Sequence, residues 1–595
     1  MAIYKAPVRD MQFVLHEMYE AEQVFASLPG CEEATRDIID AILEEAGKLC
    51  ENVIFPTNRT GDEEGCRFDD GAVTTPSGFK EAYSALTEGG WTSLACDPEY
   101  GGQGLPETLH FFVEEMLCSA NVAFSLYPGL THGAYNALHA HGTDELKSRY
   151  LPNMVAGRWS GSMCLTEPHS GTDLGLLRTK AEPQDDGSYR ITGTKIFITG
   201  GEHDLTENIV HLVLARLPDA PPGIKGISLF LVSKFLVNED GSLGERNGVV
   251  CGSIEHKMGI KGSATCVLNF DDAVGHLVGQ EHRGMNHMFT MMNHERLAVG
   301  LQGLALAEVA YQSAADYAKD RLQGRSPTGA KQADKAADPI IVHPDVRRML
   351  LTAKAYNEGA RALSGWVSLN IDIAERHPDP STREVAEDLV LLLTPVVKAF
   401  FTDYGMEACN LCLQVFGGHG YISEWGMEQL VRDARIAQLY EGTNGIQAMD
   451  LVGRKLPMHE GRLVNTYVQT IEAFLAETAS DKALTEFNEP LAASLGILKD
   501  TTDWLAENTA KNPEEVGAAA VEYLRLMALV TLAFMWARAA HVAMKKANGE
   551  EAGFYEAKLA TARFYMNRLL PQVTSLVYSI RAGADTLMAM PEASF

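Results

Sequence analysis

A change in sequence pattern near Trp159 constrains the fold of this chain more than any other feature. From there to about Leu277, short β-rich runs alternate with turn clusters, and no helical stretch separates them. Strands without crossover helices favour an antiparallel sheet or barrel over a parallel βαβ sheet. Apolar residues recur at helical spacing before this region, and the same period returns at Gly284 and lasts to the end. The predicted order is therefore helical, β, helical, helical.

The predicted fold is mainly α-helical, with a central antiparallel β domain and an added helical domain at the C-terminus. A chain of 595 residues is too long for one core, because compact domains usually hold about 150 residues. Breaks in the pattern predict an N-terminal extension, an N-terminal helical domain, a middle β domain, a helical bundle domain and a C-terminal helical extension, at residues 1–34, 35–158, 159–280, 281–460 and 461–595.

Several individual elements follow from local patterns. Apolar periodicity predicts three early helices, at residues 78–89, 107–125 and 143–156. The turn residues 185–188 predict a β-hairpin around them. Three further strands are expected at residues 209–214, 227–232 and 265–270.

The formal net charge of −29 argues against two classes of partner. Such a surface repels phosphate backbones and anionic lipid, so neither nucleic-acid binding nor membrane attachment is expected. The N-terminus lacks the apolar region of a signal peptide, and the longest apolar run, Leu526–Trp536, is shorter than the roughly 18 residues of a spanning helix. We therefore expect a cytoplasmic protein.

Common metal, nucleotide and hydrolase signatures are missing from the sequence. The pair Cys409 and Cys412 has C-x-x-C spacing, but no second pair and no histidines at ligand spacing follow. The pair is better explained as one face of a helix, so no metal site is predicted. There is no G-x-G-x-x-G after a strand, no G-x-x-x-x-G-K-[ST], no H-E-x-x-H and no G-x-S-x-G.

Four segments of the sequence are unusual. In the first, residues 163–173, Pro168 and Gly171 bend the chain while Thr166 and Thr172 offer hydroxyl groups. Such a loop can bind a polar heterocycle and an anion together. A plain turn at the end of a strand remains an equally open interpretation.

The second segment, residues 193–201, is a strand that ends in paired glycines. Alternation places Lys195, Phe197 and Thr199 on one face, where an aromatic ring and a hydroxyl group would flank a planar ligand. Taken alone, the segment is better explained as an ordinary strand.

The third and fourth segments are residues 414–421 and 432–447. In the third, a helix ends on Gly417 and Gly418, which lets the backbone approach a ligand closely, although a helix C-cap looks the same. In the fourth, Glu441 is followed at once by Gly-Thr-Asn-Gly between two helical stretches, so it lies on a junction.

Together and in this order, the four segments resemble the acyl-CoA dehydrogenase family. The family's flavin loop reads roughly T-E-P-x-x-G-[ST]-D and its strand K-x-[WF]-[IV]-[TS]-[NG]-G. Its glycine turn reads Q-x-x-G-G-x-G-[YF], and its catalytic segment reads R-D-[AS]-[KR]-I-x-x-[IL]-Y-E-G-T. The resemblance covers about residues 35–455. The flanking extensions resemble a bacterial subgroup that includes 3-methylmercaptopropionyl-CoA dehydrogenases and some fatty acyl-CoA dehydrogenases.

The resemblance implies a reaction, a cofactor and partners. Family members use FAD to oxidise the Cα–Cβ bond of an acyl-CoA to a trans-2-enoyl-CoA, in fatty-acid β-oxidation or a related degradation. By matching, Glu441 removes the α-proton while the β-hydride passes to flavin N5. An electron-transfer flavoprotein then accepts the electrons. Three alternatives stay open: a specific 3-methylmercaptopropionyl-CoA dehydrogenase of dimethylsulfoniopropionate demethylation, an oxidase that uses O2, and a non-catalytic acyl-CoA-binding homologue.

Residue-by-residue matching implies the contacts. The implied FAD-binding residues are Thr166, Gly171, Thr172, Phe197, Thr199, Arg321, Gln414, Gly417, Gly418 and Thr443. The implied substrate-binding residues are Arg296, Tyr440 and Gly442. The chain departs from the family where many members have Trp at 197, Phe at 324 and Gln at 445; it has Phe197, Gly324 and Gly445.

The resemblance also implies an assembly. The positions of Arg321, Gln414 and Gly418 match family residues that reach FAD held by a neighbouring subunit, so a homodimer is expected. In relatives with a comparable extension, the C-terminal block packs where a second dimer would otherwise lie. Residues 465–595 should therefore limit assembly to the dimer.

Overall fold

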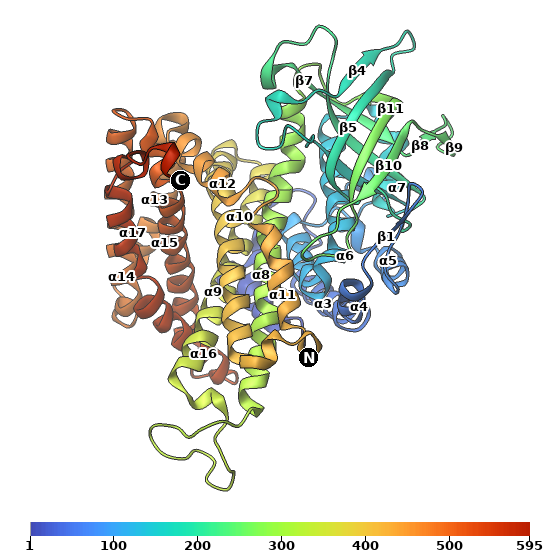
Figure 1. Cartoon of the computed structure of the whole chain (residues 1–595). Coiled ribbons are helices and arrows are strands. Elements are labelled where there is room, and N and C mark those ends of the chain that lie inside the picture. The colour runs from blue at the N-terminus through green and yellow to red at the C-terminus, as the bar shows by residue number, and fades with distance from the viewer. Residues whose placement is uncertain (1) are drawn as a thin grey trace. The chain divides into compact units, whose positions relative to one another are not determined.

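The computed structural model describes residues 2–595 and divides into two compact units (Figure 1). The bundle unit consists of Met1–Leu43 and Val299–Phe595, and the β unit consists of Glu44–Ala298. The boundaries fall inside helices α3 (Arg36–Leu49) and α8 (Gly284–Asp320). The predicted order of helical, β and helical regions is confirmed, since the strands of the main sheet all lie between residues 159 and 277 of the described chain.

Helices dominate both ends of the chain. The remaining helices of the bundle unit are α1 (Val8–Gln12), α2 (Ala21–Ala26), α9 (Pro344–Arg376), α10 (Pro380–Phe416), α11 (Met427–Ala437), α12 (Asn444–Asp450), α13 (Arg462–Thr478), α14 (Thr485–Thr509), α15 (Glu514–Lys546), α16 (Ala552–Phe564), α17 (Gln572–Arg581) and α18 (Asp585–Met588). The remaining helices of the β unit are α4 (Pro56–Glu64), α5 (Phe79–Glu88), α6 (Glu107–His141) and α7 (Asp144–Val155). The last three correspond to the three early helices that periodicity predicted, with α5 and α7 each one residue shorter at both ends.

The β unit contains one seven-stranded sheet and two small hairpins. The strands are β1 (Arg67–Asp69), β2 (Ala72–Thr74), β3 (Trp159–Cys164), β4 (Lys180–Pro183), β5 (Tyr189–Thr199), β6 (Asn208–Arg216), β7 (Ile227–Ser233), β8 (Phe235–Val237), β9 (Leu243–Arg246), β10 (Val249–Ile254) and β11 (Thr265–Leu277). The main sheet runs in the order β10-β11-β5-β4-β6-β3, and β7 pairs with both β11 and β6. Strand β7 thereby closes a ring of strands around a buried apolar core.

The pairing is antiparallel, as predicted, with one substantial exception. The expected hairpin is β4–β5, with Lys180 opposite Thr192. Strand β3, however, runs parallel to β6, from the pair Trp159 and Asn208 onward. A parallel pair needs a long connection, and here the segment between β3 and β6, which contains the β4–β5 hairpin, provides it instead of a helix.

Helix α6 is in fact a helical hairpin, which the predicted helix 107–125 did not anticipate. A straight helix would separate residues 107 and 132 by roughly 37 Å. Instead, His132 Nε2 lies 3.2 Å from Glu107 Oε1. The chain reverses at Asn121, whose φ of −161° and ψ of 96° are not helical. The Asn121 side chain caps the returning helix, because its Oδ1 accepts a hydrogen bond from the main-chain N–H of Phe124 at 3.1 Å.

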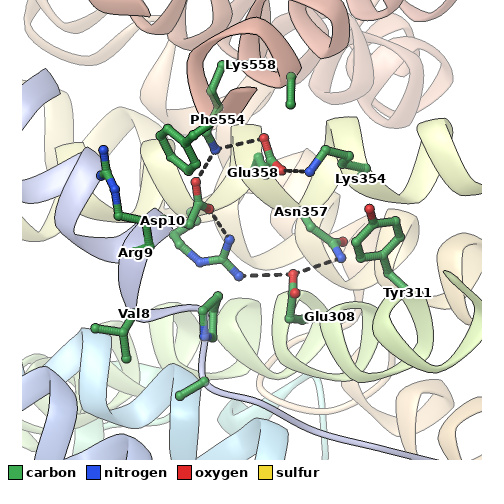
Figure 2. A pocket seen from close by; sticks show the side chains of 14 residues that line it. Val8, Arg9, Asp10, Glu308, Tyr311, Lys354, Asn357, Glu358, Phe554 and Lys558 are labelled. Carbon is green, nitrogen blue, oxygen red and sulfur yellow. Dashed lines mark hydrogen bonds and ion pairs between the residues drawn. The ribbon is translucent and has the colours of Figure 1, made fainter. Parts of the chain in front are cut away.

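Buried charges fix the N-terminal segment to the rest of the bundle unit (Figure 2). Asp10 of α1 pairs with Arg361 of α9 and Lys558 of α16. Arg361 also contacts Glu308 of α8 at 3.1 Å, and Lys558 contacts Glu358 of α9 at 2.8 Å. Burial alone would raise the pKa of Asp10, but Lys558 and Arg361 hold it well below its usual range. We call these five residues the ion-pair cluster; they border a cavity of about 310 Å³.

By length and composition alone, helix α15 could cross a membrane, because it contains an apolar window of 18 residues. Of that window, 78% is buried inside the bundle unit. The buried side chains make specific contacts: Trp536 Nε1 donates to the carbonyl of Ala355 at 3.0 Å, and Thr531 bonds the hydroxyl of Tyr467 at 2.8 Å. Helix α15 thus has the environment of a core helix.

Candidate functional site

The residues assigned by matching fall into two groups, one in each unit. The β unit holds Thr166, Gly171, Thr172, Phe197, Thr199 and Arg296. The bundle unit holds Arg321, Gln414, Gly417, Gly418, Tyr440, Glu441, Gly442 and Thr443. Each group is described within its own unit.

A buried carboxylate shapes the loop that follows β3. Glu167 Oε1 accepts from the N–H of Thr179 and from Lys195 Nζ, each at 2.9 Å, and Oε2 accepts from the N–H of Arg178 at 2.7 Å. Burial alone would raise the pKa of Glu167. Lys195 and the hydrogen bonds from Thr179 and Arg178 nevertheless hold this pKa below its usual range. The ion pair therefore fixes the base of the loop, while Gly171 and Thr172 stay exposed at its tip.

Strand β5 carries a bulge that sequence alternation missed. Ile196 and Phe197 together lie opposite one residue of β11, Val267. Phe197 has a left-handed φ of 60° and its side chain is 60% exposed, whereas Lys195 is fully buried. The expectation that Lys195, Phe197 and Thr199 share one face is therefore wrong for Lys195, because one extra residue shifts the alternation. A strained aromatic residue of this kind is typical of ligand sites.

Aromatic contacts hold the glycine turn after α10. The ring of Tyr317 stacks on that of Phe416 with centroids 4.2 Å apart, and its hydroxyl lies 3.0 Å from Nδ1 of His419. His419 in turn stacks on Trp425 at 4.6 Å. The end of α8 and the glycine turn are therefore neighbours.

This contact brings four matched residues to one end of the bundle unit. The N–H of Arg321 donates to Tyr317 at 2.9 Å, so Arg321 lies one turn further along. Arg321, Gln414, Gly417 and Gly418 are all exposed there. Gly417 has a φ of 58°, and a Cβ added at Gly417 or Gly418 would meet no atom within 4 Å. The backbone at this turn is open to close approach by a ligand.

Glu441 lies on a strained junction between α11 and α12. Its φ is 56° and that of Gly442 is 81°, so two successive residues are left-handed. For a residue other than glycine this conformation costs of order 1–3 kcal/mol and persists only where neighbours enforce it. One such neighbour is Gln447, whose Nε2 donates to the carbonyl of Glu441 at 3.0 Å.

A buried lysine that the sequence analysis did not identify anchors the same junction. Lys398 of α10 is fully buried, and its Nζ donates to the carbonyl of Gly442 at 2.7 Å and to Asn444 Oδ1 at 2.9 Å. Asn444 Nδ2 donates onward to Asp403 at 2.8 Å and Thr402 at 2.9 Å. A lysine inside the apolar stretch 389–401 was the available signal.

Three other matched residues, Tyr440, Thr443 and Arg296, have defined structural partners. Tyr440 donates its hydroxyl hydrogen bond to Gln302, which is buried in α8. Thr443 is the N-cap of α12 and accepts from an N–H of its first turn at 3.4 Å. In the β unit, Arg296 donates to Asn293 at 3.2 Å.

Family models match nearly the whole chain. The models of the N-terminal, middle and C-terminal domains of acyl-CoA dehydrogenases match residues 38–158, 162–273 and 282–456. A fourth model, described as acetyl-CoA dehydrogenase C-terminal like, matches residues 467–591. The C-terminal helical block therefore matches a separate domain family.

Relatives that align with nearly the whole chain are also named as acyl-CoA dehydrogenases. The chain is 43% identical to a 3-methylmercaptopropionyl-CoA dehydrogenase of Ruegeria pomeroyi, over 98% of this chain and 99% of that protein. It is 36% identical to a butyryl-CoA dehydrogenase of Syntrophomonas wolfei, over 100% and 99% of the two chains. The solved structure of an acyl-CoA dehydrogenase from Bacillus anthracis, complexed with FAD, shares the fold with a TM-score of 0.74 at 20% identity, covering 93% of this chain and 90% of that one.

Proposed function

The chain belongs to the acyl-CoA dehydrogenase family, and we propose that Glu441 is the base that starts its reaction. The protein is an FAD-dependent oxidoreductase that acts on the CH–CH bond of an acyl-CoA. One observation carries the assignment of Glu441: its left-handed backbone is held by a loop that is anchored on the buried Lys398. Strained backbone of this kind clusters at functional sites and persists only where neighbours hold it.

The residues of the two units fit FAD. In the β unit, the exposed loop with Thr172 and the outward ring of Phe197 suit a phosphate and a planar ring system. In the bundle unit, the open backbone at Gly417 and Gly418 and the exposed Arg321 suit the adenosine half. Bound FAD supplies the acceptor for the β-hydride of the substrate.

The protein residues handle the proton. The α-hydrogen of a thioester is too weakly acidic for a free carboxylate, so the charge that develops on the thioester oxygen needs a hydrogen-bond donor. We assign this role to the main-chain N–H of Glu441, whose carboxylate takes the proton. Arg296, Tyr440 and Gly442 are the proposed substrate contacts. An electron-transfer flavoprotein is the proposed electron acceptor.

For the substrate, we propose a short acyl-CoA, with 3-methylmercaptopropionyl-CoA as the first candidate and fatty-acid β-oxidation as the wider setting. The names of two full-length relatives, at 43% and 36% identity, both describe short acyl groups. Anaerobic titration with 3-methylmercaptopropionyl-, butyryl-, octanoyl- and palmitoyl-CoA should bleach the flavin absorbance most readily with the first two. Strongest bleaching by palmitoyl-CoA would contradict the short-chain proposal, and no bleaching by any of them would favour a non-catalytic acyl-CoA-binding protein.

Lys398→Met should lower kcat roughly 10- to 100-fold while the FAD content stays near that of the wild type. A hydrogen bond from a charged donor contributes about 1.5–3 kcal/mol to stability. Lys398 donates two such bonds to the loop that orients Glu441. Steady-state kinetics and the flavin-to-protein ratio measure the two effects separately. The exposed Lys482→Met is the matched control. A kcat within threefold of the wild type would remove Lys398 from the positioning role.

Thr172→Val and Arg321→Ala should each lower FAD occupancy more than they alter turnover per bound flavin. The first removes a hydroxyl group from an exposed loop, and the second removes a cation from the open glycine turn. The ratio of flavin absorbance to protein after gel filtration is the measurement, with Thr194→Val, at a threonine of β5, as the control. If both variants keep full occupancy, the assignment of these contacts is wrong.

Light scattering should give a homodimer of about 130 kDa, twice the chain mass of 64.9 kDa. The proposed contacts of Arg321, Gln414 and Gly418 with FAD of a second subunit require at least two copies. The C-terminal block, residues 465–595, is proposed to prevent a tetramer. A fully active, FAD-loaded monomer would contradict the shared site, whereas a tetramer would contradict only the blocking role.

A further inference from the structure

A cluster of three histidines and one glutamate lies in the β unit and has no role in the reaction derived above. Its members are Glu107 and His110 in the first turn of α6, His132 in the returning half of α6, and His294 in α8. Each offers one ligand atom, and these four atoms lie within 4.8 Å of one another. We call these four residues the histidine cluster.

The cluster is buried and leaves ring nitrogens without hydrogen bonds. His110 and His132 are 7% and 4% exposed, and the side chain of His294 is 10% exposed. His132 hydrogen-bonds Glu107 at 3.2 Å, and His294 Nε2 lies 3.9 Å from the other oxygen of Glu107. Nε2 of His110 and both ring nitrogens of His294 have no hydrogen-bond partner among the described residues. Buried polar atoms are rarely left in this state unless a water molecule or an ion satisfies them.

We propose that the histidine cluster binds one divalent transition-metal ion, with Zn²⁺ as the best-fitting species. Imidazole nitrogen and carboxylate oxygen are ligands that Zn²⁺ accepts, and four of them complete its usual tetrahedron. In a regular tetrahedron with edges of 4.8 Å, the centre lies about 2.9 Å from each corner, whereas zinc binds nitrogen at about 2.0–2.1 Å. The ligand atoms therefore need to move inward by less than about 1 Å, and the stacked rings of His110 and His132, whose planes differ by 23°, also need to turn toward the ion.

The position of the cluster indicates a structural role for the ion. It joins both arms of the α6 hairpin, which reverses at Asn121, to the first half of α8. With all four positions filled by protein groups, the ion has no open site for a substrate and supplies no redox chemistry. The carboxylate of Glu107 neutralises part of its charge. Metal removal should accordingly loosen the β unit without altering the residues proposed to handle the substrate proton.

Metal binding by the complete, FAD-loaded enzyme tests the proposal. The protein is dialysed against a chelator, incubated with Zn²⁺ and desalted, and zinc is then counted by mass spectrometry. We expect about one ion per chain, a higher melting temperature with zinc, and an anomalous diffraction peak at the zinc edge between the four side chains. An ordered water at that position, or less than a tenth of an equivalent of zinc, would overturn the proposal.

Variants tie the ion to the cluster. His110→Ala and His294→Gln should each reduce bound zinc at least tenfold and abolish the zinc-dependent rise in melting temperature. The matched control is His139→Ala, another histidine of α6 whose more exposed side chain pairs with Asp97 at 3.1 Å. An unchanged flavin-to-protein ratio shows that each variant is folded, and using two different positions keeps the test valid if one of them fails to fold. Zinc retained at wild-type stoichiometry in both cluster variants would refute the site.

Discussion

Glu441→Gln should lower kcat by roughly 10²–10⁴-fold or more, while FAD binding and folding are retained. The amide has the shape of the carboxylate but cannot accept a proton at neutral pH. The hydrogen bonds that Gln447 and Lys398 donate to main-chain carbonyls of the loop should survive, because the substitution leaves the main chain unchanged. The measurement is turnover with an artificial electron acceptor, normalised to bound flavin.

The control for this variant is Glu472→Gln, an exposed glutamate of α13 that should leave kcat unchanged. Anaerobic mixing with substrate separates chemistry from reoxidation, since the variant should fail to bleach its flavin. If Glu441→Gln keeps more than a tenth of the wild-type activity, another group is the base.

Arg361→Met should lower the free energy of unfolding of the bundle unit by about 3–5 kcal/mol. Arg361 is 1% exposed, and its removal leaves Glu308 buried without this cation and takes one of its ion-pair partners from Asp10, which keeps Lys558. Burying a charge without its partner is among the most destabilising single changes. The midpoint of the first denaturant transition, with its slope, is the measurement.

Two further variants show whether charge or packing is responsible. Arg563→Met breaks an exposed pair with Glu486 and should cost at most about 1 kcal/mol. Asp10→Asn combined with Arg361→Met should cost less than the sum of the single changes. The reason is that Asp10→Asn removes a carboxylate that would otherwise lose its Arg361 partner. Additive costs would mean that the two residues act independently.

Local signals predicted the fold well where structure depends on neighbours in sequence. The hairpin β4–β5 follows from the turn 185–188, and the helical and β regions change where the apolar period changes. The parallel pairing of β3 with β6 could not be predicted in this way, since it depends on how a long intervening segment folds. The reversal at Asn121 was equally hidden, because the apolar pattern of a helix continues through it.

The site was predictable where a motif is contiguous and not where it is assembled by folding. The segment around Glu441 was found by its own residues, but its anchor Lys398 lies 44 positions from Gly442 in sequence. The outward turn of Phe197 arises from one unmatched residue in the pairing with β11, which no periodicity within β5 reports. The histidine cluster joins residues as far apart as Glu107 and His294, so ligand spacing did not reveal it.

The attachment of Asp10 to Lys558 has a consequence for synthesis on the ribosome. These residues are 548 positions apart, so α1 emerges long before its partner in α16 exists. At about 5–20 residues per second, the first helix must wait roughly half a minute to two minutes. The β unit, a continuous stretch from Glu44 to Ala298, has no such delay and can complete its core during translation. The bundle unit closes last. Until then, the apolar face of the nascent N-terminal segment is exposed and needs to be shielded by chaperones.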